Sequence, residues 1–216
     1  MNLNDVIKKL EDIKILPVIK INDDNKAVSL ANALIAGNLE VAEITFRSEY
    51  AASAIYKIKQ TYPEMVVAAG TIINTKQADK AIQAGADFLI SPGISEELIR
   101  YCEKKKYVII PGISTASEAQ LAVSLGIDIV KFFPAETSGG IEAIKAISAP
   151  FPNLKFIPTG GINENNINMY LKNRKVIACG GSWMVKEALV DAEEYEKITE
   201  LVVSALKKVS VDQERN

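Results

Sequence analysis

Short apolar runs recur along the chain and are separated by longer segments in which apolar and polar residues mix. The runs begin roughly 20 to 27 residues apart, about the length of one strand, one helix and two short loops. Uninterrupted runs of this kind fit strands that are buried on both faces, as in a parallel sheet, although periodicity alone would also allow buried helix segments. We expect strands at residues 15–20, 39–46, 65–70, 87–91, 108–111, 127–133, 154–158 and 176–180.

The segments between these runs carry signals of helix starts and helix ends. Thr115 and Glu118 form a capping-box pattern, in which a hydroxyl and a carboxylate satisfy two free amides of the first turn. Ser95, followed by two glutamates, is a second N-cap candidate, with acids at the positive end of the helix dipole. Left-handed glycines are expected just after three of the helices, at Gly37, Gly85 and Gly126.

Eight strands that alternate with helices allow either a doubly wound sheet or a closed barrel. No Gly-x-Gly-x-x-Gly motif follows the first expected strand, and this favours a (β/α)8 TIM barrel in the α/β class. A leading helix is expected to cover the lower end of the barrel with one apolar stripe, formed by Val6, Ile7, Leu10 and Ile13. We expect residues 1–216 to form a single domain with a polar tail, residues 210–216, that frays.

Charge and composition disfavour several classes of protein. The formal net charge is -2, and basic and acidic residues are mixed, whereas a nucleic-acid-binding protein normally has a basic face. No run of roughly 18 apolar residues occurs, and residues 1–14 lack the apolar core of a signal peptide. The two cysteines, Cys102 and Cys179, lie in apolar surroundings and do not make a disulfide framework. We therefore expect a cytoplasmic protein with no membrane or nucleic-acid partner.

The chain contains no histidine. Histidine-ligated zinc sites, Ser-His-Asp triads and histidine general acids are therefore excluded. Any catalysis must depend on Lys, Glu, Asp, Arg, Ser, Thr, Tyr or backbone groups.

Polar residues at the ends of the expected strands are the first candidates for a site, because barrels of this type carry their active sites at the carboxyl ends of the strands. Lys155 lies at the start of its strand instead, so we interpret it as structural. The residues in the favoured position are Lys20, Glu43, Thr45, Arg47, Thr71, Ser91, Lys131, Thr159 and Ser182.

Lys131 is the most informative of these residues. Alternation places it on the same face as Ile127 and Ile129, where an ammonium group is costly unless it is paired or neutralised. Burial can lower the pKa of a lysine by several units, and each unit gives about ten times more of the nucleophilic amine. Lys131 is therefore a candidate nucleophile, and the alternative is a lysine that pairs with a carboxylate or binds a substrate phosphate.

Glu43 and Arg47 lie on one face of the second expected strand. Without histidine, a carboxylate such as Glu43 is the leading candidate for proton transfer. An arginine at the rim can bind a substrate carboxylate through two parallel hydrogen bonds. The alternative is an internal ion pair, Glu43 with Lys131 or Glu43 with Arg47, that only satisfies buried charge.

Glycines follow the last two expected strands, at positions where barrels of this kind often bind phosphate. Glycine lets the backbone approach an anion, and amides at the start of a following helix face it. Tight turns also need glycine, so each pair alone is a weak signal and the two together are a stronger one. The residues are Gly160 and Gly161 after the seventh strand, and Gly180, Gly181 and Ser182 after the eighth.

Seven short motifs together resemble the 2-keto-3-deoxy-6-phosphogluconate (KDPG) / 4-hydroxy-2-oxoglutarate aldolase family. They occur in the family's order from about residue 15 to the helix before the tail, and Lys-Phe-Phe-Pro-Ala-Glu is the most specific of them. The motifs are Glu43-Ile44-Thr45-Phe46-Arg47, Ala69-Gly70-Thr71, Ser91-Pro92-Gly93, Pro111-Gly112-Ile113-Ser114-Thr115, Lys131-Phe132-Phe133-Pro134-Ala135-Glu136, Pro158-Thr159-Gly160-Gly161-Ile162 and Gly180-Gly181-Ser182-Trp183.

This resemblance implies a homotrimeric class I aldolase that uses no metal and no cofactor. Its substrate would be a phosphorylated 2-keto acid, KDPG, which is cleaved to pyruvate and glyceraldehyde 3-phosphate. By position, Lys131 resembles the Schiff-base lysine and Glu43 the acid/base residue. The other implied roles are carboxylate binding by Arg47 and Thr71, stereoselection by Thr159, and phosphate binding by Gly160, Gly161, Gly181 and Ser182. Lys20 belongs to no motif of the family, so it receives no role.

Other functions stay open at this point. A phosphosugar isomerase or epimerase on the same barrel would share the phosphate loops but would not need Lys131. In a phosphometabolite-binding or scaffold protein without activity, Lys131 and Glu43 would be free to vary. Both residues are instead present within their complete motifs. Among aldolases, these residues do not distinguish KDPG, its galactonate-derived epimer and 4-hydroxy-2-oxoglutarate.

Overall fold

The computed structural model describes residues 1–211, with side chains up to residue 209. Strands and helices alternate, as the spacing of the apolar runs predicts. The strands are β1 (Ile15–Ile19), β2 (Val41–Thr45), β3 (Val66–Gly70), β4 (Phe88–Ile90), β5 (Ile109–Ile110), β6 (Gly112–Ile113), β7 (Ile129–Phe132), β8 (Lys155–Pro158) and β9 (Cys179–Gly181). The helices are α1 (Leu3–Ile13), α2 (Ala27–Ala36), α3 (Ala51–Thr61), α4 (Thr75–Gln83), α5 (Glu96–Lys104), α6 (Ala116–Ser124), α7 (Gly140–Ser148), α8 (Ile167–Leu171), α9 (Glu187–Asp191) and α10 (Tyr195–Val211), with a 3-10 turn, η1 (Asp24–Lys26), before α2.

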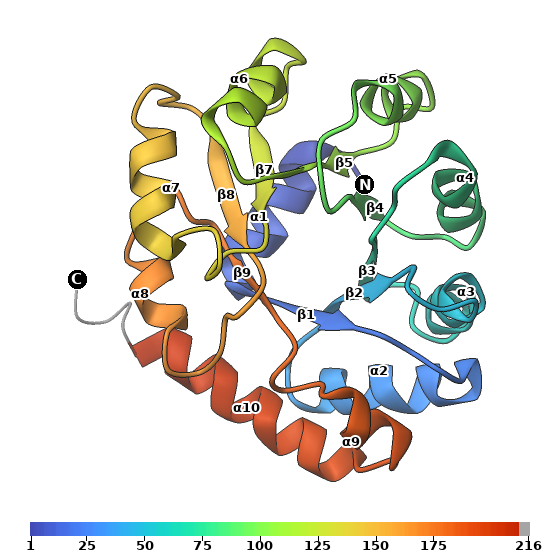
Figure 1. The fold of residues 1–216 in the computed structure, drawn as a ribbon. Helices are drawn as coiled ribbons and strands as arrows, with labels where there is room; N and C mark the ends of the chain where they lie inside the picture. The colour runs from blue at the N-terminus through green and yellow to red at the C-terminus, as the bar shows by residue number, and fades with distance from the viewer. Residues whose placement is uncertain (212–216) are drawn as a thin grey trace.

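The strands form a curled parallel sheet with helices outside it (Figure 1). One hydrogen-bonded sheet has the order β5-β4-β3-β2-β1-β9, and a second has the order β6-β7-β8. Two isolated parallel bridges, Phe156 with Val176 and Thr159 with Gly180, connect the chain at β8 with the chain at β9. The core between strands and helices consists of buried aliphatic side chains and a few aromatic ones, as a sheet covered on its outer face requires.

The fifth strand continues past its expected end at residue 111 and is divided at Pro111. Proline has no amide hydrogen, so it cannot donate to a ladder. Its carbonyl still accepts a hydrogen bond from Lys131 N at 2.9 Å. The part before it, β5, pairs with β4, and the part after it, β6, pairs with β7. The expected eighth strand is also shorter than predicted, because Val176 makes only an isolated bridge.

Most of the predicted helix ends are confirmed. Thr115 and Glu118 form the capping box of α6, and the Ser95 side chain accepts from Leu98 N at the start of α5. Gly85 and Gly126 are left-handed, with φ of 89° and 75°.

Gly37 is not left-handed, so that prediction is wrong. It has a φ of -81°, and Asn38 takes the left-handed conformation instead, with a φ of 65°. Asparagine is one of the few residues that tolerate this region. Space explains the glycine: a Cβ at position 37 would come within 2.5 Å of Val202 Cγ1 in α10.

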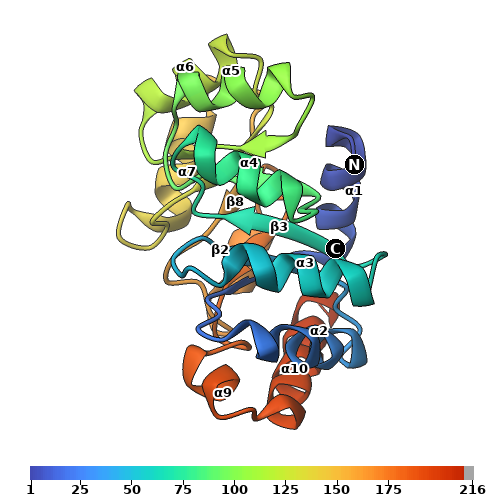
Figure 2. The same ribbon diagram turned by 90° about the vertical axis from the view of Figure 1, so that its right-hand side faces the viewer.

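The leading helix α1 covers the end of the sheet at which the strands begin. Val6 and Leu10 are buried, as the apolar stripe predicts, and Glu11 Oε1 accepts from Lys155 Nζ at 2.6 Å. Lys155 is the first residue of β8 and so lies at the end of the sheet that α1 covers (Figure 2), opposite the carboxyl ends of the strands, which is the structural position expected of it. The carboxyl ends of the strands are therefore left for a site.

Within residues 1–211, none of the helices is both long and apolar enough to cross a membrane. Ser210 and Val211 still belong to α10, and the remainder of the tail predicted to fray lies outside the described residues.

Candidate active site

A buried ion pair joins Lys131 of β7 to Glu43 of β2. Lys131 Nζ lies 3.0 Å from Glu43 Oε1 and 3.4 Å from Oε2. The two side chains are only 7% and 0% exposed. Desolvation offsets much of the attraction in such a pair, so it is weak evidence for a stabilising role. A buried charged pair between two strands is instead a candidate for chemistry.

Gly70, at the end of β3, makes room for the Glu43 carboxylate. A Cβ at this position would lie 2.1 Å from Glu43 Oε1, a distance that no side chain permits. The glycine of the Ala-Gly-Thr motif is therefore explained by the close approach of the glutamate. Thr71 follows directly and has a φ of 59°. This conformation is uncommon for a β-branched residue, and backbone strain of this kind clusters at active sites and ligand-binding segments.

A pocket of about 160 Å³ opens at the carboxyl ends of β1, β2, β7, β8 and β9. Seven of the residues singled out in the sequence line it together, namely Arg47, Thr159, Gly160, Gly161, Gly180, Gly181 and Ser182. Gly160 and Gly161 have φ of 99° and 81°, which favours glycine at both positions. The remaining lining residues are Val18, Phe133 and Ile162.

The loop after Lys131 and the glycine loop after β8 are held together by their backbones. Ala135 N donates to Thr159 O at 2.8 Å, and Glu136 N donates to Gly160 O at 3.1 Å. The Glu136 carboxylate also accepts a hydrogen bond from the Tyr170 hydroxyl in α8. Burial and this hydrogen bond raise the pKa of Tyr170, so its hydroxyl stays protonated and keeps donating. The segment that follows the lysine thus fixes the glycine loop beside the pocket.

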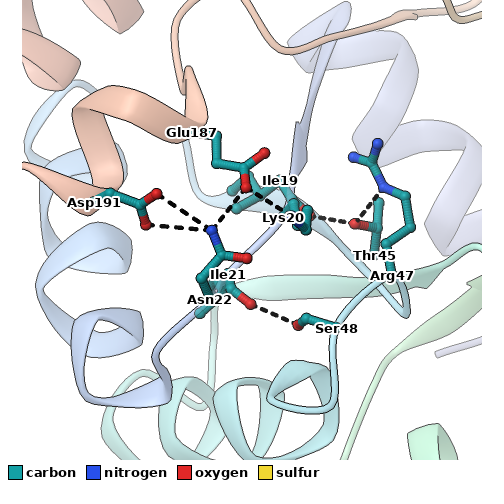
Figure 3. A network of polar contacts seen from close by, with 9 residues as sticks. All are labelled: Ile19, Lys20, Ile21, Asn22, Thr45, Arg47, Ser48, Glu187 and Asp191. Atoms are coloured by element: carbon teal, nitrogen blue, oxygen red, sulfur yellow. Dashed lines mark hydrogen bonds and ion pairs between the residues drawn. The ribbon is translucent and has the colours of Figure 1, made fainter.

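Arg47 lies at the rim, just beyond β2. Its Nε donates to Thr45 Oγ1 at 3.1 Å, and Thr45 Oγ1 donates in turn to Ile19 O at 2.8 Å. The tip of the guanidinium group extends past this contact (Figure 3). A guanidinium oriented through Nε can offer its outer N–H groups to a planar carboxylate. Of the two ion pairs that the sequence left open for Glu43, the structure has the pair with Lys131.

Phe133 is a site residue that the sequence analysis did not select. Its ring lies 5.5 Å from Lys131 Nζ, within the range of a cation–π contact, and it lines the pocket. The signal was present, because Phe133 is two residues after Lys131 and alternation puts both on one face. The contact between Lys20 Nζ and the Glu187 carboxylate, at 2.7 Å, was not predicted either.

Fold and site together define the class, an α/β protein of parallel strands whose site is centred on a buried lysine. The comparison with known families makes this specific. The chain belongs to the KDPG and KHG aldolase family, whose model matches residues 6–201.

Relatives match over nearly the whole chain. The 2-dehydro-3-deoxy-phosphogluconate aldolase of Haemophilus influenzae is 41% identical, over 91% of this chain and 93% of the relative. The KHG/KDPG aldolase of Escherichia coli K12 is 42% identical, over 89% and 90%. A crystal structure of the KDPG aldolase of Legionella pneumophila, with pyruvate captured as a covalent carbinolamine intermediate, has a TM-score of 0.89 at 39% identity, covering 92% of this chain and 97% of that one.

Proposed function

We propose that this protein is a class I aldolase that cleaves KDPG to pyruvate and glyceraldehyde 3-phosphate, and that it also accepts 4-hydroxy-2-oxoglutarate, releasing pyruvate and glyoxylate. The observation that carries the proposal is the buried Lys131–Glu43 pair, whose lysine lies 5.5 Å from the ring of Phe133, a residue that lines the glycine-rich pocket. Family membership supports it, as do relatives that carry the same activity in their names. A lysine that acts as nucleophile needs an adjacent group to take and return protons, and Glu43 is within hydrogen-bond reach.

The reaction follows from this pair. The neutral amine of Lys131 adds to the C2 carbonyl of the keto acid, and loss of water leaves a protonated imine. Glu43 then accepts the proton of the C4 hydroxyl, directly or through water. The electrons of the C3–C4 bond move into the imine, so the aldehyde leaves and an enamine remains. Protonation at C3 and hydrolysis release pyruvate and restore the free lysine.

The remaining site residues bind the two anionic ends of the substrate. Arg47 and Thr71 are proposed to hold the carboxylate next to the imine, with Thr159 setting the face from which the aldehyde reacts. The phosphate would lie against the backbone of Gly160, Gly161 and Gly181 and the Ser182 hydroxyl. Holding both ends fixes the C3–C4 bond relative to Lys131, which lowers the entropic part of the barrier.

We propose further that the two hydrogen-bonded sheets close into one (β/α)8 barrel with α1 as its lower cap, and that residues 1–216 form a single domain. The isolated bridges between β8 and β9 support closure on one side. On the other side, β5 and β6 are parts of one strand interrupted by Pro111. A homotrimer is proposed on the family resemblance alone, and a cytoplasmic location on the composition of the sequence.

The proposal is tested by measuring pyruvate release from KDPG, its galactonate-derived epimer and 4-hydroxy-2-oxoglutarate in parallel. We expect activity on KDPG, and we expect it to survive exhaustive treatment with EDTA because an imine, not a metal, is the electrophile. Strong loss of activity that a divalent ion restores would contradict the imine mechanism. No release from any of the three substrates would contradict the aldolase and favour an isomerase or a binding protein.

Ser182→Asp tests the phosphate loops. The new carboxylate would lie close to the bound phosphate, where repulsion at an effective dielectric near 20 is on the order of several kcal/mol before screening. The kcat/KM for KDPG should therefore fall at least about tenfold more than that for 4-hydroxy-2-oxoglutarate. Both substrates are measured at one ionic strength, with Ser182→Ala as the uncharged control. Equal losses on the two substrates would show that the loops do not bind phosphate.

A further inference from the structure

A network of side-chain contacts joins α9 to the end of β1. The ladder between β1 and β9 ends with the pair Pro17–Gly181, so Ser182 is the first residue beyond it. Residues 182–186 then form a turn, with Val185 N donating to Ser182 O at 3.1 Å. Beyond the ladder, side-chain contacts join the two segments of chain. They begin at Glu187, the first residue of α9.

The Glu187 carboxylate is held by two donors from the segment that follows β1. Lys20 Nζ and Asn22 Nδ2 both donate to Glu187 Oε1 at 2.7 Å. Asn22 Nδ2 also lies 3.3 Å from Asp191 Oδ2, and Lys26 Nζ donates to Asp191 O at 2.6 Å. Both ends of the short helix α9 are thus tied to residues 20–26.

The same segment is tied on its other side to the residues around Arg47 (Figure 3). Thr45 Oγ1 donates to Ile19 O at 2.8 Å, and Ser48 Oγ donates to Ile21 O at 2.5 Å. Residues 19–22 therefore connect the chain around Arg47 with the chain that follows Ser182. These are the two places at which the proposed function puts the carboxylate and the phosphate of the substrate.

The network has properties that fit positioning better than stabilisation of the fold. Lys20 and Glu187 are 30% and 46% exposed, and ion pairs as exposed as this contribute little to the free energy of unfolding. The hydrogen bonds from Asn22 and Lys20 hold the pKa of Glu187 below its usual range. The carboxylate is therefore ionised at neutral pH and keeps both donors.

We propose that Glu187 is a positioning residue that fixes the turn after Ser182 relative to Arg47, and so sets the preference for a keto acid with a phosphate at its far end. This inference rests on the proposed function. Glu187 acts through Lys20 and Asn22 and needs no contact with the substrate.

Positioning and simple electrostatic repulsion predict opposite effects of Glu187→Ala on the KM for the phosphorylated substrate. Glu187 brings a negative charge to the mouth of a site that binds anions, and Arg47 is close enough to affect its pKa. If charge alone mattered, Glu187→Ala would remove repulsion and lower the KM for the phosphorylated substrate. If the contacts with Lys20 and Asn22 position the turn, the same change raises this KM.

The experiment measures kcat and KM of the full-length protein for KDPG and 4-hydroxy-2-oxoglutarate. We expect Glu187→Ala to raise the KM for KDPG by about 3- to 10-fold, a modest effect because the contacts are partly exposed. We expect kcat on KDPG, and both constants on 4-hydroxy-2-oxoglutarate, to change by less than about twofold. Glu187→Gln keeps an oxygen acceptor for both donors and should restore part of the loss. Glu200→Ala breaks a comparable surface pair, Lys197 with Glu200 at 2.8 Å, and serves as the matched control.

A second variant makes the test independent of Glu187 itself. Asn22→Ala should also raise the KM for KDPG. The double variant Asn22→Ala/Glu187→Ala should raise it by less than the two single effects combined, because both substitutions remove the same contact between Asn22 and Glu187. An unchanged or lower KM in Glu187→Ala, or equal changes on the two substrates, would overturn the inference. A wild-type protein that cleaves neither substrate would instead refute the proposed function.

Discussion

Lys131→Arg should abolish pyruvate release while leaving the fold intact. Arginine keeps the positive charge beside Glu43, but its guanidinium group does not lose a proton and cannot form an imine. We expect kcat to fall by at least about 10⁴-fold, since removing the nucleophile of a catalytic unit costs on this order or more. The measurement is kcat on KDPG, with the melting temperature recorded for the same preparation.

Lys131→Met gives the complementary result. Methionine fills part of the space of the lysine, but it leaves the Glu43 carboxylate, 0% exposed, without its partner. Breaking a buried pair in this way costs about 3–5 kcal/mol, so this variant should lose stability as well as activity. Lys155→Met is the matched control, because Lys155 also pairs with a glutamate but does so at the opposite end of the strands. Its kinetic constants should stay at the wild-type values.

Covalent trapping identifies the nucleophile directly. Borohydride added together with pyruvate should inactivate the wild-type protein and leave one reduced pyruvate adduct, located on Lys131 by mass spectrometry. Lys131→Arg should acquire no adduct under the same conditions. Labelling at Lys20 instead, or an active Lys131→Arg, would refute the assignment.

The features of this fold that could be predicted are those determined by residues close together in the sequence. The capping box at Thr115 and Glu118 needs only residues three apart, and it was predicted correctly. The Gly37 prediction failed because a distant residue, Val202 of α10, requires the absence of a side chain there. Pro111 was visible in the sequence, but its division of the fifth strand depends on where the neighbouring strands lie, since β5 pairs with β4 and β6 pairs with β7.

The contacts of the candidate site also differ in how far the sequence could predict them. Alternation put Lys131 and Glu43 on inward faces, but they are 88 residues apart, so their pairing depended on how the strands are arranged. Two different ion pairs of Glu43 were therefore open until the structure placed the lysine. Lys20 shows the limit more clearly. Its partner Glu187 lies 167 residues away in a five-residue helix with no motif, and nothing local to either residue indicates the contact.

Glu43→Gln should slow catalysis strongly without removing the side chain that fills the site. Glutamine has nearly the same size and keeps an oxygen that can accept from Lys131. It therefore still fills the space beside Gly70. It cannot take up a proton. General acid–base catalysis contributes typically 10²–10⁴-fold, and we expect kcat on KDPG to fall by roughly this factor.

Proton exchange separates this role from that of a structural ion pair. Lys131 with pyruvate gives an enamine, and a base that moves protons at C3 also exchanges the methyl protons of pyruvate with solvent. In Glu43→Gln this exchange, followed by NMR in deuterium oxide, should slow in parallel with kcat. Glu11→Gln removes the carboxylate that pairs with Lys155 and should leave both rates unchanged. If Glu43→Gln unfolds while exchange per folded molecule stays at the wild-type rate, Glu43 only neutralises the lysine, and the proton must be moved by another group at the mouth of the pocket.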